Sequence, residues 1–547
     1  MASSILSIGQ SALAAAQVGI STTGHNIANA ATPGYNRQVI VQGAAKAQNF
    51  GFGFLGQGVD VSTIKRVYNE YLGNQVQSAQ TTKSGLDSYY AQMKQIDNLL
   101  ADPNTGLSPA MQDFFAGLQN MASNPTSIPA RQTVLSNAES LATRFHSLEG
   151  RLDEIERSLN GQIQSSVSDI NAYGQQIAQL NDAIGKAERA SGQPPNDLLD
   201  QRDQLLMELN KQIKVTVVGQ GSDYNVFIGN GQPLVVGVAT YSLTNVASQT
   251  NPEKLEVAYR ASNGSLVSLA ESALAGGQLG GLLAFRSQSL EPAQNALGRV
   301  AIGLASSFNE MHQAGFGLDG STGNPLFAMG SPVVGAHGQN TGTAVLTASI
   351  GSANDAKALT ISDYKLQFNG GTSYTLTRLS DNTPTTFNSF PQTIDGVTLS
   401  LTAGAVAGDS FLIRPTVNGA SAFGVAITDP VKLAAAGQPG AVGDNSNALS
   451  LVALQTTNTL GNGTISYQGA YSQLVSQVGN KTRELEVTSS AAGKLLTEAT
   501  TALQNESGVN LDEEAANLLR YQQAYQAAGK VMQIASELFD VLLSIGR

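Results

Sequence analysis

Residues 283–311 read LAFRSQSLEPAQNALGRVAIGLASSFNEM and place an apolar side chain at every seventh position. These positions are Leu283, Leu290, Leu297, Leu304 and Met311. A seven-residue repeat keeps one apolar stripe facing a partner helix over many turns, so the stretch predicts a long helix in a bundle. Such a stripe is more often the core of its own chain than a contact between chains, and we assign this one to the core.

The same spacing recurs on both sides of this stretch. It predicts helices over residues 72–100, 134–184 and, more weakly, 474–503, and a further helix is expected over 198–213. The step from Ile155 to Ile163 is eight residues, so a local rewinding or kink is expected there. Together these helices predict a helical trunk.

Both ends of the chain carry the repeat as well. The N-terminal stripe consists of Leu6, Leu13, Ile20 and Ile27, and the C-terminal stripe consists of Leu518, Tyr525, Met532 and Phe539. Neither end has a second long apolar partner beside it in the sequence. We therefore expect the two terminal helices to pack together and to complete their core on assembly.

Two segments between the helices show the alternating pattern of β-strands. In residues 325–437, Tyr364–Phe368 and Ser373–Leu376 flank the turn sequence Asn369-Gly370-Gly371, which is a strong hairpin signal. Residues 214–272 alternate in the same way between glycine-rich turns.

The predicted fold is therefore α+β and multidomain, with a long coiled-coil-like helical bundle and two inserted β-rich domains. We assign a terminal helical domain to residues 1–60 and 505–547, a helical trunk to 61–213, 273–324 and 438–504, a small β domain to 214–272, and a distal β domain to 325–437.

The composition excludes several classes of function. Only 13% of the 547 residues are charged and the formal net charge is −11, so the basic stripe that a nucleic acid requires is missing. No run of about 18 apolar residues predicts a membrane span, and the N-terminus lacks the basic and apolar regions of a cleaved signal. The absence of cysteine excludes disulfides, zinc–thiolate sites and thiol nucleophiles.

The four histidines do not predict a metal or catalytic site. His25, His146, His312 and His337 stand far apart, and none has a second ligand three or four positions away. The chain also lacks a phosphate-binding loop and the serine elbow of hydrolases. Each histidine is therefore interpreted as a surface residue or a satisfied interior one.

The densest group of charges consists of Asp197, Asp200, Arg202 and Asp203. Paired carboxylates could perform acid–base chemistry. Alternatively, Asn196 or Asp197 caps a helix while the acids form salt bridges around Arg202. We favour the second interpretation because acids in a first helical turn complement the helix dipole. We predict no catalytic residue, no cofactor and no metal.

The segment NIANAATPGYNR, residues 26–37, carries a recognisable turn motif. Its characteristic positions are Asn26, Asn29, Thr32, Pro33, Gly34 and Tyr35. Near the other end, residues 508–514 read GVNLDEE and residues 519–525 read LRYQQAY. Both ends resemble those of the bacterial flagellar rod, hook and hook-associated proteins.

Three central segments narrow the resemblance within this family. They are QIDNLL at 95–100, PNDLLDQRD at 195–203 and GGLLAFRS at 280–287. They are similar to the hook-associated branch, whereas a plain hook protein would lack the long helical trunk. The likeness covers roughly residues 1–320 and 440–547, and the segment 325–437 is only loosely similar.

The resemblance implies a structural role outside the cell. It implies a ring of subunits that joins hook to filament, export in an unfolded state through the flagellar type III channel, and terminal helices that line the inner tube. The implied partners are further copies of the chain, hook protein, a second junction protein (hook-associated protein 3) and a cytosolic export chaperone. The chaperone would bind the C-terminal stripe at Leu518, Tyr525, Met532 and Phe539, and neither nucleic acid nor membrane insertion is implied.

Two other functions stay open from the sequence alone. Another rod or hook protein of the same family would share the fold but polymerise further. A secreted adhesin would use its β domains to bind a host ligand. An enzyme is the weakest alternative, because no set of residues suggests a reaction.

Overall fold

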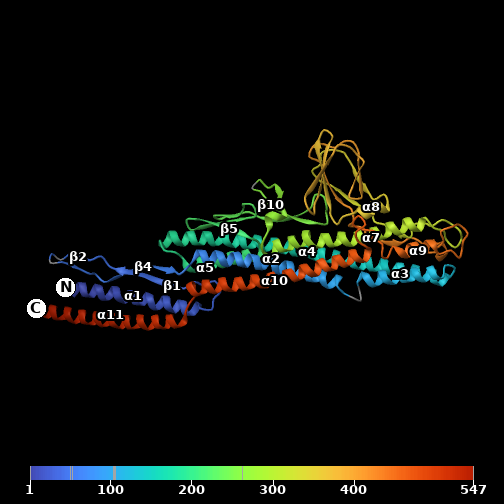
Figure 1. The fold of residues 1–547 in the computed structure, drawn as a ribbon. Helices are drawn as coiled ribbons and strands as arrows, with labels where there is room; N and C mark the ends of the chain where they lie inside the picture. Colours follow the sequence, from blue (N-terminus) through green and yellow to red (C-terminus); the bar gives the residue numbers. More distant parts are fainter. Residues whose placement is uncertain (1, 50, 52, 103–105, 262, 546–547) are drawn as a thin grey trace.

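The computed structural model describes residues 2–49, 51, 53–102, 106–261 and 263–545. The molecule is elongated, and both chain ends lie at the same end of it (Figure 1). The main helices are α1 (Ala2–Asn29), α2 (Glu70–Leu100), α3 (Leu107–Ser123), α4 (Ile128–Ser191), α5 (Asn196–Gln212), α6 (Gly277–Phe285), α7 (Glu291–Gln313), α8 (Ala353–Ala358), α9 (Ser446–Ala453), α10 (Tyr467–Ser507) and α11 (Leu511–Ile545).

The trunk is built from α2 to α7, α9 and α10 around one apolar core. The repeat in residues 283–311 runs through α6, a single π-helical turn (Arg286–Leu290) and α7. Its four leucines are at most 2% exposed, so the core interpretation of this stripe is confirmed. Among the described residues, the trunk core contains no side chain from α1, α11 or the strands between α1 and α2.

Helix α4 is the backbone of the trunk and runs unbroken for 64 residues. It stays α-helical where a local rewinding was expected. The eight-residue step is filled by Leu159, fully buried four residues from both Ile155 and Ile163. Two successive four-residue steps keep all three side chains on the buried face, so the pattern needs no interruption.

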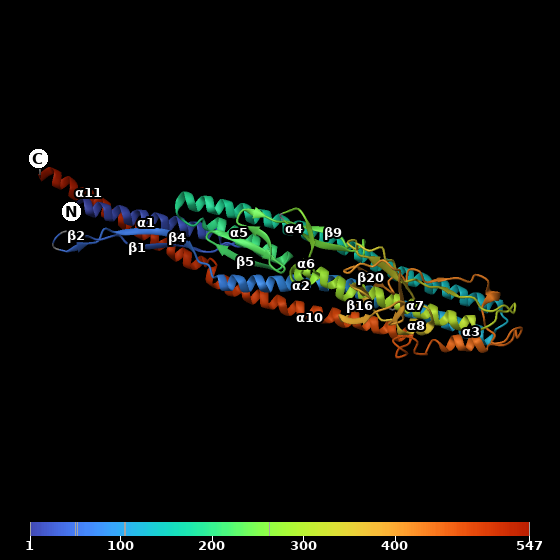
Figure 2. The same ribbon diagram turned by 90° about the horizontal axis from the view of Figure 1, so that it is seen from above.

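The small β domain lies along α4 and consists of two antiparallel sheets (Figure 2). The strands are β5 (Val215–Gln220), β6 (Asp223–Ile228), β7 (Gln232–Val236) and β8 (Ala239–Thr240) in one sheet, and β9 (Leu243–Ala247), β10 (Leu255–Arg260) and β11 (Leu266–Ser268) in the other. Their buried side chains, such as Val226 and Val257, join the trunk core.

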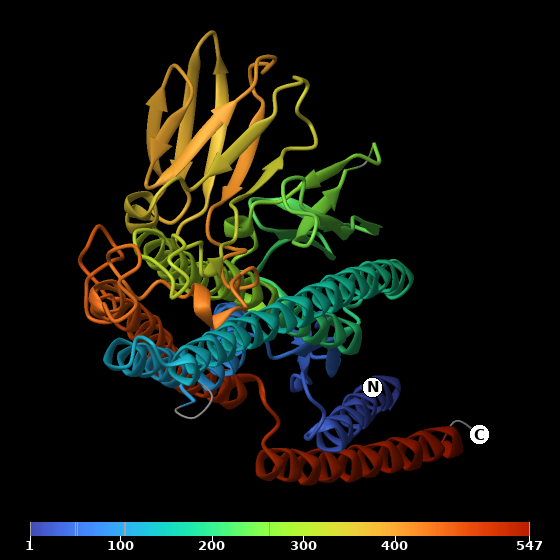
Figure 3. The same cartoon turned by 90° about the vertical axis from the view of Figure 1, so that its right-hand side faces the viewer.

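The distal β domain stands away from the trunk (Figure 3). One sheet has the order β13 (Val333–Ala336), β20 (Ser410–Arg414), β15 (Tyr364–Gly370), β16 (Ser373–Arg378) and β17 (Thr383–Phe387). The other has the order β14 (Leu346–Ser349), β19 (Val397–Leu401) and β18 (Gln392–Ile394). The predicted hairpin is present as β15 and β16, and Gly370 and Gly371 at its turn have φ of 100° and 65°.

This domain is narrower than the segment 325–437 assigned from the sequence. Strands β12 (Phe327–Ala328) and β21 (Gly424–Val425) pair with each other, and Phe327 and Phe423 pack into the trunk core. The separate core of the distal domain uses side chains from Leu346 to Ile413, with Ile302 of α7 at its base.

The terminal domain extends beyond the trunk and contains α1, α11 and an antiparallel pair of strands, β1 (Gln38–Ala44) and β4 (Val59–Arg66). Short strands β2 (Gln48–Asn49) and β3 (Phe54–Leu55) extend the pair. Helices α1 and α11 lie side by side and antiparallel. The α+β multidomain fold predicted from the sequence is confirmed.

Candidate assembly site

The two terminal helices touch along a line of small side chains. Gly9 of α1 lies against Met532, and a Cβ atom at Gly9 would be 3.0 Å from the Met532 Cγ atom. A Cβ atom at Gly19 would be 2.6 Å from the Tyr521 ring. Ala16 on α1 and Ala535 on α11 are also buried. Small residues let the two backbones approach closely, so close packing holds this pair together.

The predicted stripes lie largely beside this line. Leu6 is 42% exposed and Ile27 is 37% exposed, while Leu13 and Ile20 are half-buried. On α11, Leu518 and Met532 are half-buried, whereas Tyr525 and Phe539 are 41% and 53% exposed. Within one chain, the contact therefore follows the small residues on α1 and not the Leu6–Ile27 stripe, and on α11 it includes Met532 of the predicted stripe. Glycine and alanine carry little apolar signal, so the sequence pattern pointed to the larger side chains next to them.

The helix pair leaves much apolar surface in solvent. On α11 the exposed side chains include Leu519, Ile534, Leu538 and Val541, all between 45% and 60% exposed. Surface of this kind on a two-helix unit indicates a core that a partner completes.

Helix α1 also qualifies as a membrane span by length and composition alone, over Ser4–Asn29, which the sequence analysis had not expected. Core helices of soluble proteins and signal sequences near the N-terminus have the same length and composition, so these two properties do not by themselves identify a membrane span. In this structure the Gly9 and Gly19 side of the helix packs against α11.

The turn motif at the end of α1 is organised by Asn26, which is 1% exposed. Its Oδ1 atom accepts hydrogen bonds from the Tyr35 hydroxyl at 2.7 Å and the Gln38 amide at 2.9 Å. Its Nδ2 atom donates to the Gln38 carbonyl at 2.8 Å and to Glu514 Oε2 at 3.1 Å. One amide thus closes the turn and reaches the last helix, which explains why asparagine occupies this position.

The remaining motif residues shape the backbone of the turn. The Asn29 side chain accepts from the Thr32 hydroxyl at 3.2 Å and donates to the His25 carbonyl at 3.0 Å. Gly34 has a φ of 78°, a conformation that favours glycine. Burial raises the pKa of Tyr35, so its hydroxyl keeps the proton that it donates to Asn26.

The turn is tied to the trunk by the carboxylates of α5. Asp200, 5% exposed, accepts from the Asn36 backbone amide at 2.9 Å and from the Asn36 side chain at 2.6 Å. Arg66 of β4 donates to Asp200 at 2.8 Å and to Asp203 at 2.6 Å. Burial raises the pKa of Asp203, and the charge of Arg66 opposes that rise.

The acids of α5 form structural salt bridges and hydrogen bonds, as the favoured interpretation predicted, but two details of that interpretation were wrong. Arg202 forms no salt bridge with them; it donates to Asn181 at 3.0 Å and lies over the Tyr224 ring. No side-chain cap is found at the start of α5, where Pro195 occupies the cap position and Asn196 donates instead to the Ile64 carbonyl. Asp200 and Asp203 pair instead with Arg66 of the terminal domain, which lies more than a hundred residues earlier in the chain.

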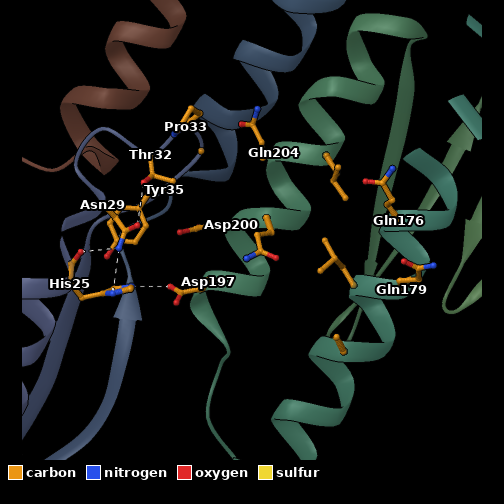
Figure 4. Close-up of a pocket in the computed structure, with 15 residues that line it drawn as sticks. His25, Asn29, Thr32, Pro33, Tyr35, Gln176, Gln179, Asp197, Asp200 and Gln204 are labelled. Carbon is orange, nitrogen blue, oxygen red and sulfur yellow. Dashed lines mark hydrogen bonds and ion pairs between the residues drawn. The ribbon is translucent and has the colours of Figure 1, made fainter. Parts of the chain in front are cut away.

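A cleft of about 690 Å³ lies between the turn and helices α4 and α5 (Figure 4). His25 lines one side of this cleft, and its Nε2 atom lies 3.2 Å from the Oδ1 atom of Asp197. The other wall carries Gln176 and Gln179 of α4. Among the described residues, no group of three or more His, Asp or Glu side chains could hold a metal ion, in this cleft or elsewhere.

His312 lies in the trunk core with both ring nitrogens satisfied. Nδ1 is 2.6 Å from the Asn324 carbonyl oxygen, and Nε2 accepts from the Ala434 amide at 2.9 Å. This arrangement fits a neutral ring, and burial lowers the pKa of His312 to about 4.

We expect the trunk to lose stability as the pH falls from 6.5 towards 4. In that window the unfolded chain protonates His312 while the folded chain does not, so acid favours unfolding. The full effect is roughly 3 kcal/mol. Urea unfolding of the wild type and of His312→Gln at several pH values measures it, and an equal pH slope in both proteins would contradict the expectation.

Family descriptions match successive parts of the chain. "Flagellar hook-associated protein FlgK helical domain" matches residues 93–327, and "Flagellar hook-associated protein 1, D2-like domain" matches residues 336–415. "Flagella basal body rod protein" matches residues 6–36, and "Flagellar basal body rod FlgEFG protein C-terminal" matches residues 502–545.

Whole-length relatives agree with these matches. Flagellar hook-associated protein 1 of Escherichia coli K12 is 38% identical over 551 residues, covering 99% of this chain and 100% of the relative. The chain belongs to the flagellar hook-associated protein 1 family. Its counterpart in Salmonella typhimurium is 39% identical, with the same coverage, and that in Bacillus subtilis is 24% identical over 97% of this chain and 96% of its own length.

A solved structure from the family shares the fold. The flagellar hook junction protein FlgK of Burkholderia pseudomallei superposes with a TM-score of 0.74 at 31% identity, over 79% of this chain and 99% of that chain. Family membership makes the chain a structural flagellar protein, as the turn motif and the C-terminal segment predicted.

Proposed function

We propose that this chain forms a ring of subunits at the hook–filament junction and so couples the hook to the filament. The observation that carries the proposal is the incomplete core of the α1–α11 pair, whose exposed apolar side chains need further copies to cover them. Family membership supports the position, because the structural relative is itself named a flagellar hook junction protein.

The proposed contact between subunits uses the two large-residue stripes. On α1 they are Leu6, Leu13, Ile20 and Ile27, and on α11 they are Leu518, Tyr525, Met532 and Phe539. All eight of these side chains stay at least partly exposed after the helices have paired, which supports this assignment. The small residues, together with Met532, hold each subunit's own pair together, and the exposed side chains of the two stripes remain for neighbouring copies.

The partners at the two sides of the ring would be hook protein and a second junction protein, hook-associated protein 3. The ring would therefore lie in the extracellular flagellum. Export through the flagellar type III channel fits a chain without cysteine, in which no disulfide can block passage.

A cytosolic chaperone that covers α11 before export would solve a physical problem. The exposed apolar side chains of α11 make it prone to premature association while it lacks partners. Calorimetry with a chain lacking residues 508–547 tests this part of the proposal: affinity for the chaperone should disappear, and unchanged affinity would refute it.

Electron microscopy of a deletion strain tests the position of the ring. Cells without this protein should keep intact hooks and shed unassembled flagellin, and the wild-type gene should restore filaments. Cells without hooks would place the protein in the rod or hook instead, and normal filaments would refute a junction role.

A further inference from the structure

The two ends of the chain meet at a buried carboxylate. Glu514, in the first turn of α11, is 2% exposed although it is charged. Its Oε2 atom accepts from Asn26, 488 residues away, and its Oε1 atom lies 3.1 Å from Arg37 Nε. A buried carboxylate is stable only while its partners hold it, so this contact depends on both ends being in place.

The partners of Glu514 are the residues that close the turn motif. Asn26 uses its remaining hydrogen bonds on Tyr35 and Gln38, and Arg37 immediately precedes β1, the strand that leads away from the turn. The Arg37 backbone amide donates at 2.8 Å to the carbonyl of Ser507, the last residue of trunk helix α10. Without a docked α11, the buried Asn26 amide loses one acceptor and the Arg37 guanidinium loses its carboxylate partners, while the bond from the Arg37 backbone to α10 remains.

Apolar packing cannot replace these contacts. The described residues of α1 and of β1 to β4 contribute nothing to the trunk core, and the turn touches the trunk through polar side chains such as Asn36 and Arg66. Most of the stability of an amphipathic helix in a protein comes from packing of its apolar face, and α11 is the main packing partner of α1. The order of residues 26–38 therefore depends on the docking of α11 in addition to the bonds that Asn36 and Gln38 make to α5.

We propose that Glu514 is a latch: the N-terminal turn closes only after the last helix of the chain has docked, so the terminal domain folds as one unit from both chain ends. The carboxylates Asp200 and Asp203 then fix the direction in which the closed unit leaves the trunk. The consequence for assembly rests on the proposed function, whereas the latch itself is a property of one chain.

Hydrogen exchange on the full chain tests the latch. In Glu514→Ala, residues 26–38 should exchange about a hundredfold faster than in the wild type, while residues 134–184 of the trunk should not change. The matched control is Glu513→Ala, because Glu513 also binds Arg37 but is 56% exposed; its effect should stay within about threefold. Equal exchange of residues 26–38 in Glu514→Ala and wild type overturns the latch, whether that exchange is slow or fast.

A charge swap in cells gives a second readout. Arg37→Glu and Glu514→Arg should each remove most attached filaments, and the double variant should restore a large part of them. A double variant no better than either single one overturns the pairing. If the charge swap fails but the wild-type gene restores filaments in the same strain, the latch is refuted and the proposed junction function is not. The failure of the latch can therefore be distinguished from the failure of the proposed function.

Discussion

Met532→Asp should abolish filament attachment while leaving the trunk folded. Met532 lies against Gly9 at the contact between α1 and α11, beside the apolar Val531 side chain, so the substitution places a carboxylate in a close apolar contact. Burying an unpaired charge at a close helix contact costs about 3 kcal/mol or more. That is enough to open a two-helix unit with little other core. The trunk should keep its melting temperature, since its core contains no described side chain of α11.

The matched control for this prediction is Gln533→Asp, one residue further along α11 on its exposed side. It adds the same charge to the same helix and should leave attachment largely intact. Filaments counted by electron microscopy in a strain lacking the wild-type gene, together with calorimetric melting of the purified chains, separate assembly from stability. Normal filaments with Met532→Asp would show that the α1–α11 contact is not needed for assembly.

Asp200→Ala should detach the terminal domain from the trunk. Asp200 is the buried acceptor for two Asn36 donors and for Arg66, and its loss leaves these groups without their main partner. Removing one member of a buried charged network costs about 3 to 5 kcal/mol. Hydrogen exchange should therefore accelerate in residues 36–44 and 59–66 and stay slow in α4.

The control for Asp200→Ala is Asp197→Ala, three residues earlier in the same helix. The Asp197 side chain is 57% exposed, so its bonds to His25 and Gln38 contribute less. Filaments sheared from cells that carry each variant give a mechanical readout, and Asp200→Ala should lose them at lower shear. Equal behaviour of the two variants would mean that the acids of α5 do not anchor the terminal domain.

Part of the assembly site could be predicted from sequence. The seven-residue repeats located both terminal helices, and the NIANAATPGYNR segment identified a turn that Asn26 and Gly34 do shape. The glycines of the contact line between the helices were not predicted, because Gly9 and Gly19 matter through the side chains that they lack.

The sequence predicted that the α5 acids form salt bridges, but it did not predict their partner. Their density predicted salt bridges, but Arg202 was the nearest cation in sequence and Arg66 the nearest in space. Glu514 belongs to the GVNLDEE segment that carried the family resemblance, but its burial was not predicted, since an acid in a first helical turn is ordinary and its burial depends on residues at the other end of the chain.

The sequence by itself determined the long helices, the inserted β-rich domains, the lack of catalytic motifs and the family. These follow from local rules, because periodicity, turn residues and motifs act over a few residues to a few turns. The tertiary structure alone decided which faces of α1 and α11 touch, where the distal domain begins, and how Asn26, Asp200 and Glu514 connect the chain ends to the trunk. These contacts join residues far apart in the chain, such as Asn26 and Glu514 at a separation of 488, and their strength comes from burial, which no local pattern encodes.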